Sequence, residues 1–319
     1  MRRIAVCVPY IRGRYDKRIT EAARAAGFAV DYYDAPEKLA PEIDRYEILY
    51  GDVGPAIIKN AANLRWVCSP NAGVEKYQPA CAMPKGCALS NSSGAYGLAI
   101  AEHIVMVLLM LMRRMPEYQQ AAIERSWSCF SPIRSISGSN LVLLGTGDIG
   151  SNAARRLKAL GANVTGVCRS GKSKEPAFDR VVTTDELDSL LPDADALIIS
   201  LPSTPDTIGI LSRERIARLG RKALVINVGR GSAIDQDALV EALQARSIAG
   251  AALDVMAPEP LPADHPLWTC PNTIITPHVS GNDALDITCD LDVNMFLEDL
   301  SRYAKGLPPL NLVNRDLGY

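Results

Sequence analysis

A short apolar run near the middle of this chain ends in three glycines at a fixed spacing, and it limits the fold more than any other stretch. Residues 141–144 are Leu-Val-Leu-Leu, which is typical of a buried strand, and Gly145, Gly147 and Gly150 follow at once. Apolar residues at helical spacing continue from Ala153. This succession favours a dinucleotide site, because the turn brings the backbone close to a pyrophosphate and the helix N-terminus offers it free N–H groups. A purely structural glycine-rich turn is the alternative. The predicted nucleotide contacts are Gly145, Thr146, Gly147, Asp148, Ile149 and Gly150.

The size and charge of the chain are those of an ordinary globular protein. It has 319 residues, enough for two domains, and its formal net charge of −2 gives no electrostatic reason to bind nucleic acid or an anionic membrane. Its eight cysteines include no Cys-x-x-Cys pair, which predicts reduced thiols in a cytoplasmic protein and no metal site. The longest apolar run, residues 104–112, is too short to span a bilayer, so we expect a buried helix there.

Strands and helices alternate along both halves of the sequence. Such alternation predicts parallel sheets covered by helices, so the expected fold class is α/β with two Rossmann-like, doubly wound domains. We expect five strands before residue 100 and six between residues 140 and 278. The predicted strands are residues 4–8, 29–33, 47–50, 65–68, 87–90, 141–144, 164–168, 196–201, 224–228, 250–255 and 273–276.

Two long helical stretches, residues 97–115 and 283–305, lie at the joins between the halves. The chain is therefore expected to leave a first domain, build a second one and return to the first. We predict a discontinuous, flavodoxin-like substrate-binding domain from residues 1–97 and 283–319. The dinucleotide-binding Rossmann domain is predicted for residues 98–282.

The second predicted strand of the nucleotide domain indicates which dinucleotide is bound. An NAD site usually carries an acid about 20 residues after the glycines, where it bonds the ribose 2′-OH. Cys168 stands at that place here, and Arg169, Ser170 and Lys172 follow. A guanidinium and hydroxyl donors suit a 2′-phosphate, which a carboxylate would repel, so we predict NADP. The alternative is that Arg169 and Lys172 are solvated loop charges.

The sequence has only three histidines, which shortens the search for a proton donor. His103 lies on the apolar 97–115 stretch, where a packed or surface residue is expected, and His265 lies in a loop that its side chain could cap. His278 follows the last predicted strand, so it faces the edge at which α/β sheets bind ligands. Arg230 follows the fourth strand of this domain and Glu259 lies beyond the fifth. Taken alone, Arg230 could be a solvated arginine and Glu259 a carboxylate at the rim. Together with His278 they follow three strand ends that flank one crevice, and this favours a shared site.

These three side chains supply what a carbonyl reduction needs. Hydride arriving at a carbonyl carbon leaves negative charge on the oxygen, which the Arg230 cation stabilises while it also binds a neighbouring carboxylate. His278 can then give the oxygen a proton near neutral pH. Glu259, if paired with His278, fixes the tautomer of the imidazole and favours its charged form.

The same residues lie in motifs that resemble those of the D-isomer-specific 2-hydroxyacid dehydrogenases. The motifs are Asn-Val-Gly-Arg-Gly around Arg230, Asp-Val-x-x-x-Glu-Pro-Leu-Pro around Glu259, and Thr-Pro-His ending at His278. Leu-Pro-x-Thr-Pro-x-Thr at residues 201–207 and His-Pro-Leu-Trp at residues 265–268 also match.

The resemblance implies two similar α/β domains with NADP between them, a homodimer, and catalysis by Arg230, Glu259 and His278. The departure at Cys168 from the NAD-using members resembles NADP-preferring glyoxylate/hydroxypyruvate reductases. The backbone that follows the predicted strand at residues 65–68 would bind the substrate carboxylate, and Asp254 would lie near the nicotinamide amide. The implied substrate contacts are Asn71, Ala72, Gly73 and Val74. The further implied cofactor contacts are Leu201, Pro202, Thr207, Val228, Gly229, Asp254 and Gly281.

Two functions stay open at this point. The favoured one is an NADPH-dependent oxidoreductase that reduces a 2-oxo acid to a D-2-hydroxy acid, with glyoxylate and hydroxypyruvate as candidates from the family. The alternative is an NADP(H)-sensing binding or corepressor protein, because a fold does not fix a function. A short-chain reductase is set aside since the sequence has no Tyr-x-x-x-Lys.

The serine-rich stretch 126–138 is expected to be exposed, with Trp127 packing at an interface.

Overall fold

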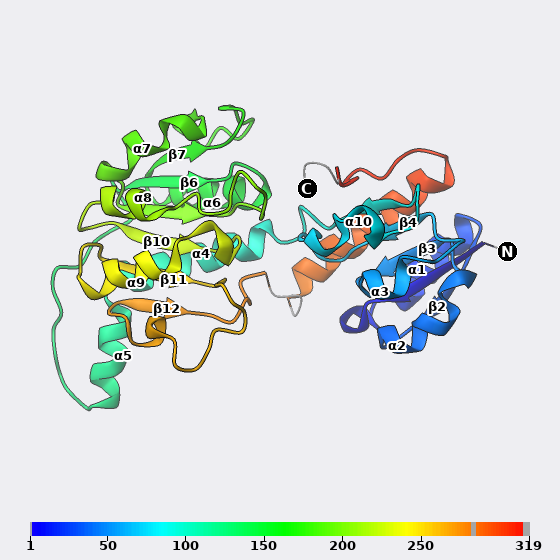
Figure 1. The fold of residues 1–319 in the computed structure, drawn as a ribbon, viewed down its shortest axis with the longest axis horizontal. Helices are drawn as coiled ribbons and strands as arrows, with labels where there is room; N and C mark the ends of the chain where they lie inside the picture. Colours follow the sequence, from blue (N-terminus) through cyan, green and yellow to red (C-terminus); the bar gives the residue numbers. More distant parts are fainter. Residues whose placement is uncertain (1, 282–284, 315–319) are drawn as a thin grey trace. The chain divides into compact units, whose positions relative to one another are not determined.

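The structure is a computed structural model that describes residues 2–281 and 285–314. The chain forms two compact units (Figure 1). Unit 1 is Met1–Tyr96 with Asn282–Tyr319, and unit 2 is Gly97–Gly281. The first unit is discontinuous, as the sequence predicts. The substrate-binding and dinucleotide-binding roles assigned to the two parts stay predictions.

Unit 1 contains a five-stranded parallel sheet in the order β2-β1-β3-β4-β5. All five strands predicted from the apolar runs are present. The strands are β1 (Arg2–Cys7), β2 (Phe28–Tyr32), β3 (Ile48–Gly51), β4 (Trp66–Cys68) and β5 (Ala88–Ser90). The helices are α1 (Asp16–Ala25), α2 (Pro36–Leu39), α3 (Pro55–Ile58) and α10 (Asp286–Ala304).

Helix α10, drawn in orange in Figure 1, returns from the end of the chain to cover one face of this sheet. Its buried residues recur every three or four positions, which places Val293, Phe296 and Leu300 on one side. Phe296 stacks on Tyr50 of β3 with ring centroids 4.1 Å apart, and on Trp66 of β4 at 5.9 Å. Large buried aromatic surfaces of this kind fix the helix firmly against the sheet.

Unit 2 contains a seven-stranded parallel sheet in the order β12-β11-β10-β9-β6-β7-β8. The strands are β6 (Asn140–Leu144), β7 (Asn163–Val167), β8 (Arg180–Val182), β9 (Ala196–Ile199), β10 (Leu224–Asn227), β11 (Gly250–Leu253) and β12 (Thr273–Ile275). The helices are α4 (Gly97–Met112), α5 (Met115–Ile123), α6 (Asp148–Ala159), α7 (Leu187–Leu190), α8 (Arg213–Arg218) and α9 (Gln236–Gln244).

Two expectations for unit 2 were wrong in detail. The sheet has a seventh strand, β8, whose three residues are too few to show a pattern in the sequence. The predicted helix at residues 97–115 is two helices, because Arg114 has φ 60° between α4 and α5. Pro116 lies two residues further on and cannot continue the preceding helix, since its nitrogen has no hydrogen to donate. Residues 283 and 284 of the predicted last helix lie outside the described residues.

No helix in residues 2–281 and 285–314 is both long and apolar enough to cross a membrane.

Candidate active site

The glycine turn after β6 is built for close backbone approach. Gly145 has φ 106°, which favours glycine, and a Cβ there would lie 2.8 Å from Ser200 Oγ. A Cβ at Gly150 would lie only 2.0 Å from the carbonyl oxygen of Gly145. Helix α6 begins at Asp148, so its N-terminal N–H groups follow the turn directly. β6 lies between β7 and β9, which is the switch point at which open α/β sheets bind nucleotides.

The turn after β7 lies beside this glycine turn. The Cys168 thiol is hydrogen-bonded to side chains of Thr146 and Ser170, the latter at 3.5 Å. Burial raises the pKa of the Cys168 thiol, but these hydrogen bonds outweigh burial and the net pKa is lowered. Residues 168–172 include Arg169 and Lys172 and no carboxylate. Contact of this turn with the ribose of a dinucleotide stays a prediction.

The loop after β9 meets the turn after β10. Thr207 Oγ1 donates to the carbonyl of Pro202 at 2.6 Å, which closes the loop on itself. A Cβ at Gly229 would lie 2.6 Å from the carbonyl oxygen of Leu201, so only glycine fits there. Val228 donates its N–H to Ile199 and extends the sheet pairing by one residue. These predicted cofactor contacts therefore lie together at the carboxyl edge of the sheet.

Arg230 follows β10 in a turn that its own neighbours hold. Asn227 Nδ2 donates to the carbonyl of Arg230 at 2.9 Å, and Arg230 Nη1 donates to the carbonyl of Gly229 at 2.8 Å. A Cβ at Gly231 would lie 2.1 Å from the backbone of Met256, so this turn packs tightly on the loop that follows β11. That contact brings the Arg230 segment beside the segment that carries Glu259.

Glu259 and His278 are in direct contact. Glu259 Oε2 lies 2.8 Å from His278 Nδ1, and Glu259 Oε1 accepts the Met256 N–H at 2.9 Å. The imidazole is half-exposed, and the carboxylate orients it. β10, β11 and β12 are adjacent in the sheet, which explains how residues far apart in the sequence meet.

The carboxylate of Asp254 is hydrogen-bonded to the segment that carries His278. It is buried, and its carboxylate accepts hydrogen bonds from Thr276 Oγ1 at 2.6 Å, Val279 N at 2.9 Å and Ser280 N at 3.0 Å. Burial raises the pKa of Asp254, but these hydrogen bonds outweigh burial and the net pKa is lowered. The His278 N–H also donates to the carbonyl of Asp254 at 2.8 Å, and His278 has φ 54°.

Sequence reasoning did not find this supporting role. It placed Asp254 near the cofactor and overlooked Thr276 and the Met256 N–H. An acid at the end of one strand and a threonine at the end of the next were the available signal. Contact of Asp254 and Gly281 with a cofactor stays a prediction.

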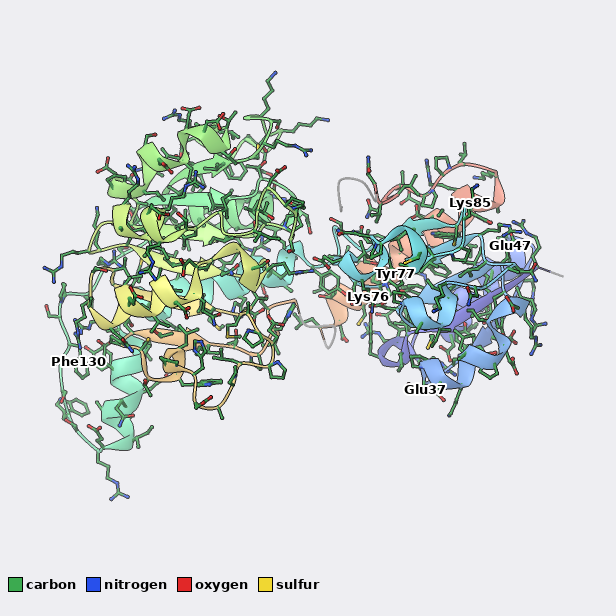
Figure 2. The ribbon with its side chains drawn as sticks, in the orientation of Figure 1. Glu37, Glu47, Lys76, Tyr77, Lys85 and Phe130 are labelled. Carbon is green, nitrogen blue, oxygen red and sulfur yellow. The ribbon has the colours of Figure 1, made fainter. Side chains whose placement is uncertain are left out.

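The predicted substrate loop belongs to unit 1, where it follows β4. Asn71 Nδ2 donates to Asp52 Oδ2 at 2.5 Å, and Asn91 Nδ2 donates to the carbonyl of Ala72 at 2.8 Å. Tyr77 and Lys76, labelled in Figure 2, also reach Asp52, at 2.6 Å and 2.7 Å. Val74 is buried, whereas Gly73 is partly exposed. The loop is thus tied to its own sheet at several points, and its contact with substrate stays a prediction.

The other two histidines have structural surroundings. His265 Nδ1 accepts the Leu267 N–H at 3.2 Å and so caps a short 3-10 helix (Pro266–Thr269), as its loop position suggested. Burial lowers the pKa of His103 on α4, and the charge of Asp254 opposes that effect. In the part of the chain that the structure describes, no group of three or more His, Cys, Asp or Glu side chains could hold a metal ion.

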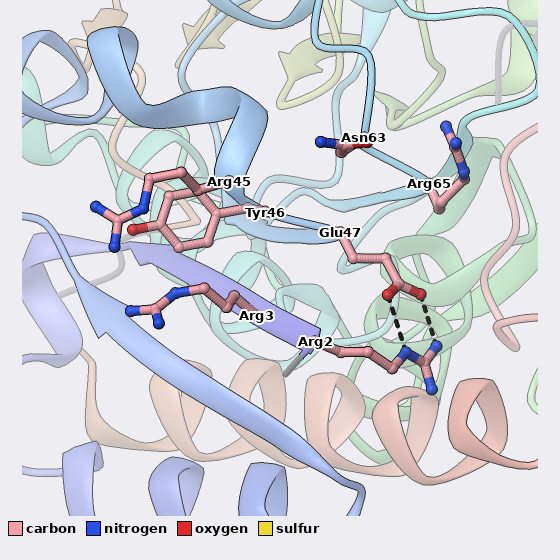
Figure 3. Close-up of a pocket in the computed structure, with 7 residues that line it drawn as sticks. All are labelled: Arg2, Arg3, Arg45, Tyr46, Glu47, Asn63 and Arg65. Atoms are coloured by element: carbon pink, nitrogen blue, oxygen red, sulfur yellow. Dashed lines mark hydrogen bonds and ion pairs between the residues drawn. The ribbon is translucent and has the colours of Figure 1, made fainter.

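An arginine-rich hollow of about 390 Å³ lies at the opposite, amino edge of the unit 1 sheet (Figure 3). Arg2 forms a two-point ion pair with Glu47, Arg3 is paired with Asp31, and Arg45 is paired with Glu42. Most of its positive charge is therefore already matched. It lies far along the strands from the Asn71 loop and is not part of this site. Its lining residues are Arg2, Arg3, Arg45, Tyr46, Glu47, Asn63 and Arg65.

Comparison with known families gives one match that covers more than half of the chain. The model for the NAD binding domain of D-isomer specific 2-hydroxyacid dehydrogenases matches residues 105–280. Glyoxylate reductase/hydroxypyruvate reductase of Mus musculus is 34% identical over 69% of this chain and 68% of its own. D-3-phosphoglycerate dehydrogenase of Archaeoglobus fulgidus is 31% identical over 87% of this chain. The chain spans about half of that relative, 53% of its length.

Solved structures agree with this match. A D-isomer specific 2-hydroxyacid dehydrogenase family protein from Aeromonas salmonicida is 32% identical, with a TM-score of 0.87 over 99% of both chains. The NADPH-dependent glyoxylate/hydroxypyruvate reductase from Sinorhizobium meliloti, solved with NADP and sulfate, is 26% identical, with a TM-score of 0.81 over the full length of both chains.

Proposed function

The chain belongs to the D-isomer specific 2-hydroxyacid dehydrogenase family of oxidoreductases, and from that premise we propose that it reduces a 2-oxo acid to a D-2-hydroxy acid with NADPH. The observation that carries the proposal is the 2.8 Å contact between His278 Nδ1 and Glu259 Oε2. An imidazole oriented by a carboxylate, at the carboxyl edge of a dinucleotide-binding sheet, is suited to proton transfer.

The cofactor would supply a hydride to the carbonyl carbon of the acid. The residues of this chain would bind the substrate, stabilise the developing charge and donate the proton. Arg230 would bind the carboxylate of the substrate and stabilise the negative charge that develops on its carbonyl oxygen. His278, held through Nδ1 by Glu259, would donate the proton of its other ring nitrogen, Nε2, to that oxygen. The backbone of residues 71–74 would bind the substrate carboxylate.

The choice of NADPH rests on the turn after β7. Cys168 occupies the place of the acid that recognises NAD, and Arg169, Ser170 and Lys172 offer a guanidinium, a hydroxyl and an ammonium to a 2′-phosphate. Relatives solved with NADP or NADPH support this choice. We expect kcat/KM for NADPH to exceed that for NADH by at least about tenfold, and equal values would contradict the NADP assignment.

A panel of 2-oxo acids tests the reaction itself. Oxidation of NADPH is followed with glyoxylate, hydroxypyruvate and larger 2-oxo acids, and chiral analysis identifies the hydroxy acid formed. Turnover that yields the D isomer supports the proposal. Tight NADPH binding without turnover of any 2-oxo acid would instead favour the alternative, an NADP(H)-sensing binding or corepressor protein.

We further propose that the protein works as a homodimer in the cytoplasm. The side chain of Trp127 is 102% exposed in the isolated chain, and Ile123 and Ile133 near it are 76% and 53% exposed. Apolar groups so fully exposed on one segment are typical of an interface. The eight free thiols are consistent with a reducing compartment.

A further inference from the structure

A buried carboxyl group in unit 1 lies one side chain away from the predicted substrate loop. Asp292 of α10 is 1% exposed. Tyr50 of β3 donates its hydroxyl proton to Asp292 Oδ2 at 2.6 Å. On the other side, Ser92 Oγ is hydrogen-bonded to Asp292 Oδ1 and also lies 3.1 Å from the carbonyl oxygen of Ser69.

Ser92 and its neighbour are the anchors of that loop. The N–H of Ser92 donates to the carbonyl of Asn71 at 3.2 Å, and Asn91 Nδ2 donates to the carbonyl of Ala72 at 2.8 Å. Ser69, whose carbonyl faces the Ser92 hydroxyl, begins the loop. A change in the hydrogen bonding of the Ser92 hydroxyl therefore acts at the start of the loop, residues 69–74.

The number of protons in this network depends on Asp292. A serine hydroxyl has one proton, so it cannot donate to both the Ser69 carbonyl and an ionised carboxylate. If Asp292 is protonated, its own hydroxyl donates to Ser92 Oγ, and the Ser92 proton is available for Ser69. If Asp292 is ionised, it competes for that proton, and a buried carbonyl at the base of the loop loses its donor.

We propose that Asp292 is a positioning residue that, in its protonated form, completes a hydrogen-bond relay through Ser92 to the substrate loop. The inference rests on the function proposed above only for the identity of what the loop binds. The relay itself lies wholly within unit 1. It makes the order of the loop, and hence its affinity for an anionic substrate, depend on pH.

The surroundings of Asp292 bring its titration into a pH range that experiments can reach. Burial raises its pKa to about 6, although the hydrogen bonds from Ser92 and Tyr50 act in the opposite direction. The titratable groups that face the site from the packed strands are Tyr50 of β3 and Cys68 of β4, and Asp299 lies further along α10. Burial raises the pKa of the Tyr50 phenol and of the Cys68 thiol well above their usual values, so both stay neutral through this range.

The first test needs no substrate. Amide hydrogen exchange of a peptide covering residues 69–77 is compared at pH 5.0 and pH 7.5 after correction for intrinsic exchange rates. We expect protection in the wild-type protein to fall about threefold to tenfold as the pH rises, the effect of one hydrogen bond. Asp292→Asn carries an amide N–H in place of the acid proton, so its loop should stay protected at both pH values.

Two further variants show whether the relay is the cause. Ser92→Ala should lose the protection at both pH values. Asp299→Asn is the matched control, because Asp299 is also a buried carboxyl on α10 but accepts from the Leu310 N–H and not from Ser92. It should behave as the wild type. Equal protection of the wild-type loop at both pH values, or the same response in the two Asn variants, would overturn the relay.

Kinetics with glyoxylate as the probe then give a second readout. A loop that binds ground state and transition state alike changes KM and leaves kcat unaltered. We expect the KM of the wild type and of Asp299→Asn to rise about threefold to tenfold through pH 6, relative to a flatter profile in Asp292→Asn. Parallel KM profiles would exclude an effect on substrate binding. Absence of all turnover would contradict the proposed function, while the exchange result would still decide the relay.

Discussion

His278 is the residue whose removal tests the proposed chemistry most directly. His278→Ala removes the proposed proton donor, and loss of general acid catalysis lowers rates by about 10²- to 10⁴-fold. We expect kcat to fall within that range while the Kd for NADPH, measured by fluorescence titration, changes little. Glu259→Gln is a graded control, because Gln can still accept the Met256 N–H but orients the imidazole less strongly. An unchanged kcat in His278→Ala would remove His278 from the reaction.

A second test at this scale concerns Cys168. Cys168→Asp places a carboxylate beside the predicted 2′-phosphate, and like charges in contact cost several kcal/mol. We expect kcat/KM for NADPH to fall at least about tenfold while that for NADH rises. Cys168→Ser, which has similar size and no charge, should keep the preference of the wild type. A variant that loses activity equally with both cofactors would show that this turn does not read the ribose.

Single residues could be proposed from the sequence where their chemistry is rare. With three histidines in the chain, the position of His278 after a strand was enough to propose it as the proton donor, and the structure shows its contact with Glu259. The role of Asp254 was harder to predict, because its carboxylate accepts hydrogen bonds from Thr276, Val279 and Ser280. Backbone donors leave no mark in the sequence. The same holds for the Met256 N–H, which orients Glu259.

At the scale of elements, the long parallel strands and the glycine turn were visible in the sequence and the short pieces were not. β8 has only three residues, so no period can be seen in it. The apolar run of α4 ends at Met112, and Arg113, Arg114 and Pro116 mark the break before α5, whereas the predicted helix ran on to residue 115. The Asp292 network could not have been predicted, because it joins β3, the segment after β5 and α10 across about 240 residues of sequence.

Helix α10 provides a stability test that is independent of activity. Asp292 has a pKa of about 6 in the folded protein, against 3.8 for its ordinary value. A raised carboxyl pKa means that its contribution to stability is greatest below pH 4 and is lost as the pH rises from about 4 to about 6. The loss corresponds to about 3 kcal/mol.

The measurement is urea denaturation of wild type and Asp292→Asn between pH 4 and pH 7. The free energy of unfolding of the wild type should fall relative to that of the variant as the pH rises through this window, because Asn does not titrate. Asp299→Asn, on the same helix, shows how much a raised carboxyl without the Ser92 contact contributes. A constant difference between wild type and Asp292→Asn at every pH would mean that Asp292 does not titrate between these values.

At the scale of the whole molecule, the segment between α5 and β6 is the part least explained by a single chain. Trp127 is fully exposed, and residues 126–138 carry few buried side chains. Unit 2 also has an apolar hollow of about 410 Å³ between α4 and α6, lined mainly by the side chains of Val105, Met106, Ala159 and Leu160. An isolated chain gains nothing by exposing such groups, so we expect a second copy to cover them.

Trp127→Ser is the test of that assembly. A buried tryptophan at an interface typically contributes about 2 kcal/mol, so the Kd of the dimer should rise about 30-fold. Sedimentation equilibrium over a range of protein concentrations measures this directly. Leu307→Ser is the control, because Leu307 is an exposed apolar residue of unit 1 that lies on neither of these surfaces. Two results would contradict a dimer formed through this segment. One is a wild-type protein that stays monomeric at micromolar concentration, and the other is a Trp127→Ser variant that dimerises as well as Leu307→Ser.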